Sequence, residues 1–133
     1  MPTPRKSATI LLVDDNESLR TSLTELLTLK GYRAFEAPNA EHALSFVMQL
    51  GNELDVLVTD IVMPGMDGFE LSRKVHSIYP GIGIIHMSAY AIAEMAGSEF
   101  DFDVVLRKPV PISVLVDAVE RVARRDPGNS GGC

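Results

Sequence analysis

The chain has 133 residues, which is enough for one domain built around one hydrophobic core. Hydrophobic residues make up 46% and charged residues 23%, so collagen-like, coiled-coil and disordered classes are poorly supported. Twelve Lys and Arg against eighteen Asp and Glu give a net charge of -6, which argues against a nucleic-acid surface, and the lone cysteine, Cys133, forms no intrachain disulfide.

The start of the chain and its apolar segments predict neither a signal peptide nor a membrane span. The first apolar run is too short for a signal peptide, and no stretch approaches the roughly 18 apolar residues of a membrane span. We therefore expect a cytoplasmic protein that contacts neither a membrane nor a nucleic acid. One domain is predicted at residues 8–125, with disordered ends at 1–7 and 126–133.

The first half of the chain alternates apolar runs with segments of helical period. Residues 8–13 predict a buried strand, and residues 32–37 predict a second, more polar strand. Between them, leucines recur at helical spacing before Gly31, a residue typical of a helix end. Asn39 is a suitable cap for the next helix, which ends at Gly51. The apolar face of that helix is predicted to hold Ala43, Leu44, Val47 and Met48.

The second half continues the alternation. Residues 55–59 predict a strand that runs into Asp60, and the turn residues of segment 63–68, MPGMDG, precede a helix over 69–78. A strand at 82–87 ends before Ser88, after which residues 91–96 predict only a short or irregular fourth helix. A strand at 104–106 and a last helix that ends near Arg125 complete the chain.

Strands that alternate with helices predict an α/β fold: a five-stranded parallel sheet with helices on both faces, joined by right-handed crossovers in a flavodoxin-like, doubly wound (βα)5 arrangement. In such sheets ligands bind at the carboxyl ends of the strands. We therefore expect one pocket formed by the polar residues that follow the strands, which are Asp14, Asp15, Asp60, Ser88 and Lys108.

Three clustered carboxylates call for a cation. At about 4 Å and an effective dielectric near 20, each pair would repel by about 4 kcal/mol. Oxygen ligands suit Mg²⁺, which keeps several waters and so leaves positions free for phosphate oxygens. A carboxylate can attack phosphorus while a lysine and a hydroxyl contact the transferred oxygens. The layout therefore favours phosphoryl transfer.

Four motifs give the chain a family resemblance. They are ILLVDDNESLR at residues 10–20, DVLVTDIVMPGMDGFEL at 55–71, IIHMSAY at 84–90 and LRKPVP at 106–111. In this order and spacing they resemble the receiver domains of two-component response regulators. The resemblance spans nearly the whole predicted domain, and DIVMPGMDG alone is highly specific for the family.

The resemblance implies a role for each acidic residue. Asp60 would be phosphorylated by a histidine kinase or a histidine phosphotransfer protein. Asp15 would bind Mg²⁺ directly, Asp14 would assist through water, and Val62 would supply its backbone carbonyl to the metal. The chain would catalyse only its own phosphorylation and dephosphorylation, switching its affinity for a downstream protein whose identity the sequence leaves open, as a monomer or weak dimer.

The resemblance also assigns residues on the other side of the pocket. Ser88 matches the hydroxyl that contacts the phosphoryl group, and Lys108 matches the lysine that pairs with it, followed by a cis bond to Pro109. One position departs from the pattern: Val105 stands where many receivers carry an aromatic residue that swings inward on activation. Tyr90 is either a surface residue beside the pocket or a substitute for that aromatic residue.

Two alternatives to a phospho-accepting switch remain open. One is a receiver-like docking module that works without phosphate. The other is a small enzyme on the same fold, although the acidic run Asp14 to Glu17 would repel a flavin phosphate, and Val62 stands where a dehalogenase-like phosphatase needs a second Asp.

Several residues near the motifs are predicted to be structural. Asp67 and Gly68 should cap and shape the loop after Asp60. His86 should be a core or edge histidine, because the three histidines lack the spacing of metal ligands. The scattered methionines, Met48 among them, should fill gaps in the core or pack loops.

Overall fold

The computed structural model describes residues 8–63, 65–89 and 104–123. Its strands are β1 (Thr9–Val13), β2 (Arg33–Ala37), β3 (Val56–Asp60), β4 (Gly83–Ser88) and β5 (Val104–Arg107). Its helices are α1 (Glu17–Leu29), α2 (Ala40–Leu50), α3 (Gly68–Ile78) and α4 (Ile112–Ala123), with a 3-10 turn, η1, at Gly51–Glu53.

The strands form one parallel sheet in the order β2-β1-β3-β4-β5, which confirms the predicted fold class. Every residue of β1, β3 and β4 is buried, since helices cover both faces of these inner strands, and this explains their continuous apolar runs. The edge strands β2 and β5 are only partly buried. Strand order reverses between β1 and β3, which is where such sheets bind ligands.

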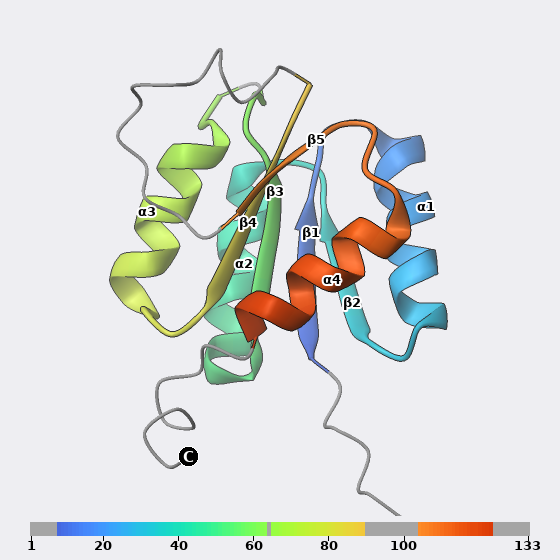
Figure 1. The fold of residues 1–133 in the computed structure, drawn as a ribbon. Coiled ribbons are helices and arrows are strands. Elements are labelled where there is room, and N and C mark those ends of the chain that lie inside the picture. The colour runs from blue at the N-terminus through green and yellow to red at the C-terminus, as the bar shows by residue number, and fades with distance from the viewer. Residues whose placement is uncertain (1–7, 64, 90–103, 124–133) are drawn as a thin grey trace, which may run out of the picture.

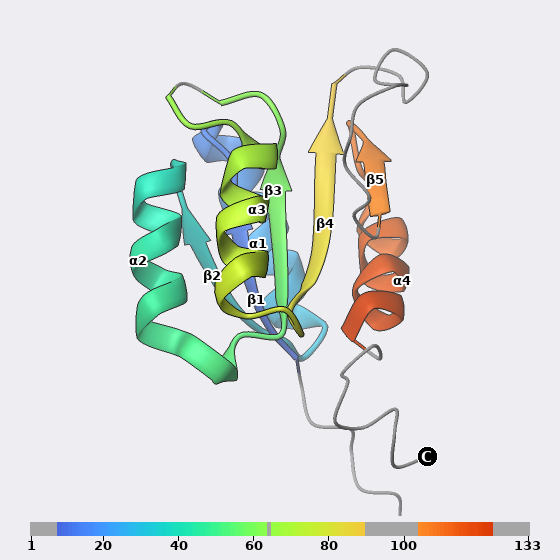
Figure 2. The same cartoon turned by 90° about the vertical axis from the view of Figure 1, so that its left-hand side faces the viewer.

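Two helical layers enclose the sheet (Figures 1 and 2). Successive side chains of a strand point to opposite faces. In β1, Leu12 therefore packs in the cluster that holds Leu27 of α1 and Leu115 of α4. Its neighbour Leu11 packs on the other face, with Val47 of α2 and Leu71 of α3.

Side-chain caps start three of the helices. Asn16, Asn39 and Asp67 each accept a hydrogen bond from the backbone amide three residues on, at 3.0, 2.8 and 2.9 Å respectively. These bonds satisfy amides that the first helical turn leaves without partners. The predicted caps Asn39 and Asp67 are thereby confirmed.

Some expectations differ from the structure or fall outside it. Met48, predicted on the apolar face of its helix, is 61% exposed, because Ala40, Ala43 and Val47 form the stripe that faces the sheet. The 3-10 turn η1 follows α2 directly, where the sequence predicted only that the helix ends at Gly51. The predicted fourth helix at 91–96, Tyr90 and the predicted disordered ends lie outside the described residues.

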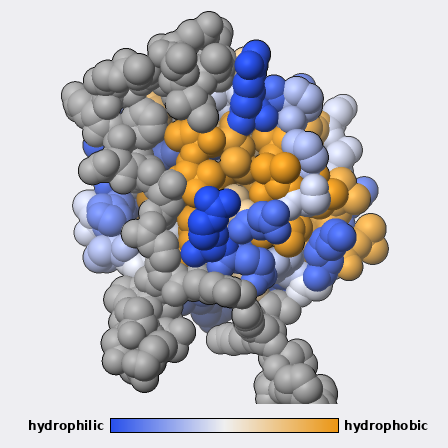
Figure 3. Space-filling model, in the orientation of Figure 1, coloured by the Kyte–Doolittle hydropathy of each residue, from blue (hydrophilic) through white to orange (hydrophobic). Residues whose placement is uncertain are grey.

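The layer of α1 and α4 carries an exposed apolar surface. Figure 3 shows apolar residues gathered over α4 and toward α1. Large apolar side chains exposed on these helices are Val114 of α4 and Leu26 and Leu29 of α1. Among the described residues, none of the helices combines the length and apolarity needed to cross a bilayer.

Candidate functional site

Three carboxylates meet at the carboxyl ends of β1 and β3, which lie at the top of Figure 2. Asp14 and Asp15 follow β1 directly, and Asp60 is the last residue of β3. Because the two strands are parallel neighbours, with Val13 beside Thr59, the residues that follow emerge side by side. One carboxylate oxygen from each of the three aspartates lies within 4.8 Å of the others, as the sequence predicted.

The three carboxylates differ in exposure. Asp14 is fully buried and Asp60 is 6% exposed, whereas Asp15 is exposed to solvent. An open groove of about 390 Å³ runs beside Asp15, lined also by Asn39 and by Gly65 and Met66 of the loop after β3. The cluster is thus buried at Asp14 and Asp60 and open to solvent at Asp15.

Lys108 reaches this cluster from the far edge of the sheet. Its Nζ lies 2.9 Å from Oδ2 of Asp14 and 3.0 Å from Oδ2 of Asp60. The backbone amide of Lys108 also donates to the carbonyl of Ser88, at 2.7 Å. Its bond to Pro109 is cis, as the family resemblance implied.

Burial and charge act against each other in this cluster. Burial raises the pKa of Asp60, and the negative charges of Asp14 and Asp15 add to the rise, although Lys108 opposes it. Burial alone would lower the pKa of Lys108, but its hydrogen bonds and ion pairs with Asp14 and Asp60 outweigh that effect and raise it. Lys108 is therefore cationic and balances one of the three carboxylate groups, so the ionised cluster keeps a net negative charge that attracts a further cation.

Asp14 is held by contacts on several sides. Its amide donates to the carbonyl of Ala37 at 3.2 Å, and its Oδ1 accepts from the amide of Asn16 at 2.9 Å. Its Oδ2 pairs with Lys108, and its carbonyl accepts from Nη1 of Arg20 at 3.0 Å. Sequence reasoning missed Arg20, whose only signal was a position within the first motif.

Ser88 and Val62 lie beside the cluster. Ser88 ends β4 and is 1% exposed, and the residue before it, Met87, pairs with Asp60 across the sheet. Val62 is 59% exposed, two residues after Asp60, at the solvent side of the loop. The predicted site residues are therefore brought to the same end of the sheet.

Gly68 begins α3 directly against the end of β3. A Cβ atom on Gly68 would lie 2.1 Å from the carbonyl oxygen of Asp60 and 2.9 Å from Cα of Ile61. The Gly68 amide donates to the carbonyl of Ile61 at 2.8 Å. Only glycine allows this close approach, which fixes the loop after Asp60 and confirms a structural role for Gly68.

His86 is a buried core residue of β4, as predicted. Its Nε2 lies 2.7 Å from Oγ of Ser72 in α3, and its ring centroid lies 5.0 Å from that of Phe69. Burial lowers its pKa from 6.5 to about 4, against the raising effects of Gly68 and Asp67, so the ring is neutral at neutral pH.

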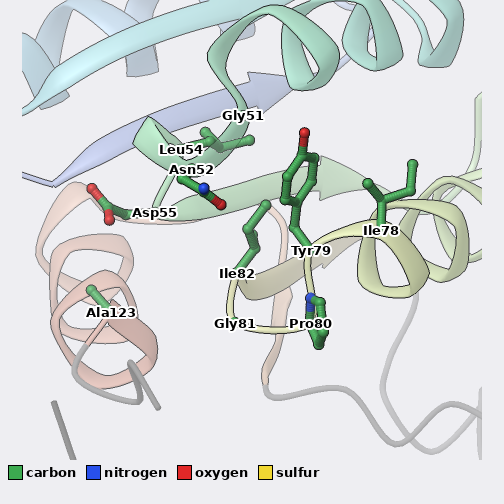
Figure 4. Close-up of a pocket in the computed structure, with 10 residues that line it drawn as sticks. All are labelled: Gly51, Asn52, Leu54, Asp55, Ile78, Tyr79, Pro80, Gly81, Ile82 and Ala123. Atoms are coloured by element: carbon green, nitrogen blue, oxygen red, sulfur yellow. The ribbon is translucent and has the colours of Figure 1, made fainter. Parts of the chain in front are cut away.

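A second pocket, of about 390 Å³, lies at the opposite end of the sheet. It is bounded by η1, the end of α3, the turn at residues 80–82 that precedes β4, and Ala123 (Figure 4). Tyr79 points from the end of α3 toward Gly51. Asp55, on its wall, accepts a hydrogen bond from the amide of Thr9 at 2.8 Å. This pocket is therefore separate from the carboxylate cluster.

The donor set of the cluster fits one kind of metal. Its oxygens come from carboxylates, and neither histidine nor cysteine belongs to the group. Such hard oxygen donors suit Mg²⁺, which binds few carboxylates and keeps waters in its remaining positions. The exposed Asp15 gives those waters room.

Fold and site together define a doubly wound α/β protein with an acidic site at the switch point of its sheet. Residues 10–120 match the family model of the response regulator receiver domain. The chain belongs to this family, as its motifs indicated.

Individual relatives agree with this assignment. The chain is 32% identical over 114 residues to sporulation initiation phosphotransferase F of Bacillus subtilis, which covers 84% of this chain and 90% of that protein. It is 35% identical over 124 residues to sensor kinase CckA of Brucella abortus, which covers 90% of this chain but only 13% of the kinase. Similar sequences therefore occur both as nearly whole proteins and as parts of larger ones.

One of the similar solved structures contains bound Mg²⁺. Response regulator protein TrrA of Thermotoga maritima, solved in complex with Mg²⁺ and BeF, has a TM-score of 0.76 and 30% sequence identity to this chain. The match covers 86% of this chain and 98% of TrrA.

Proposed function

We propose that this chain is the phospho-accepting receiver of a two-component phosphorelay, in which Asp60 takes a phosphoryl group from a histidine kinase or a histidine phosphotransfer protein. The observation that carries the proposal is the double contact of Lys108, at 2.9 Å to Asp14 and 3.0 Å to Asp60. It puts a cation at the acceptor carboxylate, where a transferred phosphoryl group would need one.

The same proposal includes a Mg²⁺ site. Asp14, Asp15 and Asp60, with the backbone carbonyl of Val62, would hold the ion, and support comes from their clustered oxygens and from the exposure of Asp15. When bound, Mg²⁺ neutralises charge on the carboxylates and on the phosphoryl oxygens. The complex of TrrA with Mg²⁺ and BeF supports this assignment by similarity.

In the transfer step, a carboxylate oxygen of Asp60 attacks phosphorus and forms the new P–O bond. The bond from phosphorus to the donor imidazole nitrogen breaks, and its electron pair stays on that nitrogen. Lys108 then pairs with a phosphoryl oxygen, and the hydroxyl of Ser88 donates a hydrogen bond to another. Hydrolysis of the acyl phosphate by water returns Asp60 to its starting state, so the chain catalyses only its own phosphorylation and dephosphorylation.

The output is a change of affinity for a downstream protein. Val105, half-buried in β5 beside His86, cannot act as an aromatic switch residue. The sequence-based hypothesis that residues 89–103 reorder instead concerns a segment that, from residue 90 on, lies outside the described residues. The receiver unit would comprise residues 8–125 and act in the cytoplasm as a monomer or weak dimer.

Incubation with acetyl phosphate and Mg²⁺, followed by mass spectrometry of the intact protein, tests the proposal. Wild type should gain the mass of one phosphoryl group, and Asp60→Asn should gain none. Asp67→Asn is the matched control, because it removes a nearby carboxylate outside the cluster, and it should still be labelled.

The same assay separates the second candidate, a docking module that works without phosphate, which Val105 favours. Wild type that stays unlabelled while it folds normally would support the docking module. An adduct that persists in Asp60→Asn would refute Asp60 as the acceptor.

A further inference from the structure

We infer that Arg20 and Glu36 form a positioning pair that holds the acidic loop after β1 in the geometry that binds Mg²⁺. Neither residue belongs to the carboxylate cluster, so both would act through Asp14 and Asp15. This inference rests on the proposed function, because it concerns the metal site of the same reaction.

The contacts of Arg20 link three elements. Arg20 lies in the first turns of α1, and its side chain is only 13% exposed. Its Nε donates to Oε1 of Glu36 in β2 at 2.7 Å, and its Nη1 donates to the backbone carbonyl of Asp14 at 3.0 Å. Thr21 Oγ1 also donates to Glu36, at 3.3 Å. One guanidinium thus ties the acidic loop to α1 and to β2.

The bond to Asp14 also constrains Asp15. The carbonyl that accepts from Arg20 belongs to the peptide that joins Asp14 to Asp15. Because a peptide group is planar, fixing its oxygen fixes the direction in which the chain enters Asp15. The Asp15 side chain is exposed, so the backbone of the loop, rather than packing, directs its carboxylate toward Asp60.

Only arginine meets the geometry of these two contacts. Its planar guanidinium group donates from Nε to one acceptor and from Nη1 to another at the same time, whereas lysine has a single ammonium group on a flexible side chain. Glu36, whose side chain is 33% exposed, orients the guanidinium group of Arg20 and balances its charge. The pair therefore holds the loop without adding a net positive charge beside the site.

A positioning role of the pair and a purely electrostatic role predict opposite effects of Arg20→Gln on the affinity for Mg²⁺. If the pair positions the loop, Arg20→Gln and Glu36→Gln should both weaken Mg²⁺ binding, by about tenfold or more, as loss of groups that orient metal ligands commonly does. If the pair acts only through its charges, Glu36→Gln should weaken binding, but Arg20→Gln should tighten it, since it removes a cation near the metal. Arg20→Lys keeps the charge and should recover only part of the affinity.

The measurement is the dissociation constant for Mg²⁺ alone, by isothermal titration calorimetry, with urea unfolding in EDTA to record stability separately. The exposed pair Arg33 and Glu53 is the matched control, because it joins β2 to η1 at 3.6 Å, away from the site. Arg33→Gln and Glu53→Gln should leave the affinity unchanged. A loss of stability in Arg20→Gln with wild-type Mg²⁺ affinity would overturn the inference, as would tighter binding.

Failure of this inference differs from failure of the proposed function. At saturating Mg²⁺, Arg20→Lys and Glu36→Gln should still be phosphorylated at Asp60 by acetyl phosphate. Normal labelling with unchanged Mg²⁺ affinity in both variants would reject the positioning pair alone. Absence of labelling in wild type would reject the proposed function.

Discussion

Burial of His86 should make the protein less stable in mild acid. Its pKa falls from 6.5 to about 4 because β4 and α3 remove it from water. In the unfolded chain the ring takes up a proton as the pH falls through 6.5, whereas in the folded protein it stays neutral until about 4. The unfolded state therefore binds more protons than the folded state between pH 6.5 and about 4. Across this range the free energy of unfolding decreases as the pH is lowered.

The size of the effect follows from the two pKa values. Stability should fall by about 1.4 kcal/mol for each pH unit below 6.5, which amounts to about 2 kcal/mol between about pH 7.5 and about pH 5. Well above pH 6.5 the ring is neutral in both states and contributes nothing to the pH dependence.

Urea unfolding of wild type and His86→Met at the two pH values measures this term. Methionine fills a similar volume, and the Ser72 hydroxyl keeps its hydrogen bond to the carbonyl of Gly68, at 2.8 Å. The acid-induced loss should be smaller in His86→Met than in wild type by about 2 kcal/mol. His76→Gln, at an exposed position near the end of α3, is the control and should behave as wild type. Equal losses in wild type and His86→Met would refute the reasoning.

Three further outcomes are expected. Mg²⁺ should raise the melting temperature of wild type by binding only the folded state, and Asp15→Ala should abolish that rise; a persistent rise would mean that the ion binds elsewhere. Gly68→Ala should lower the free energy of unfolding by about 1–3 kcal/mol and slow labelling of Asp60, because the added methyl group forces the backbone of Asp60 to move. The control for this variant is Gly83→Ala, whose added methyl group would contact Val122 at the opposite end of the sheet. It should lower the free energy of unfolding without a specific effect on labelling of Asp60. Val62→Asn should speed loss of the phosphoryl group, because an amide can orient the attacking water and valine cannot; decay no faster than wild type would argue against this role.

The sheet was predictable because the environment of its strands is uniform. Inner strands that are buried on both faces are largely apolar, so β1, β3 and β4 were visible as apolar runs, with bounds correct to within one residue. A helix that covers a sheet needs apolar residues on one stripe only. For that reason Met48 could not be placed from the sequence, since its neighbour Val47 already fills the stripe.

The acidic cluster was predictable for a similar reason. Parallel strands bring their carboxyl ends together, so Asp14, Asp15 and Asp60 had to converge once the strands were known. Contacts made by long side chains between elements were not predictable. Neither the reach of Arg20 to Glu36 nor the pairing of His86 with Ser72 has a local pattern, because each depends on how a helix is seated on the sheet.

Lys108 gives the acidic cluster a counter-charge that belongs to the chain itself. It forms ion pairs with the two carboxylates that are buried, Asp14 and Asp60, and leaves the exposed Asp15 to meet solvent. Folding therefore does not have to wait for an ion, and an ion that departs does not leave two buried charges unpaired. The proposed Mg²⁺ site could therefore be emptied and refilled many times during the life of one folded molecule, and its occupancy would then follow the concentration of free magnesium around it.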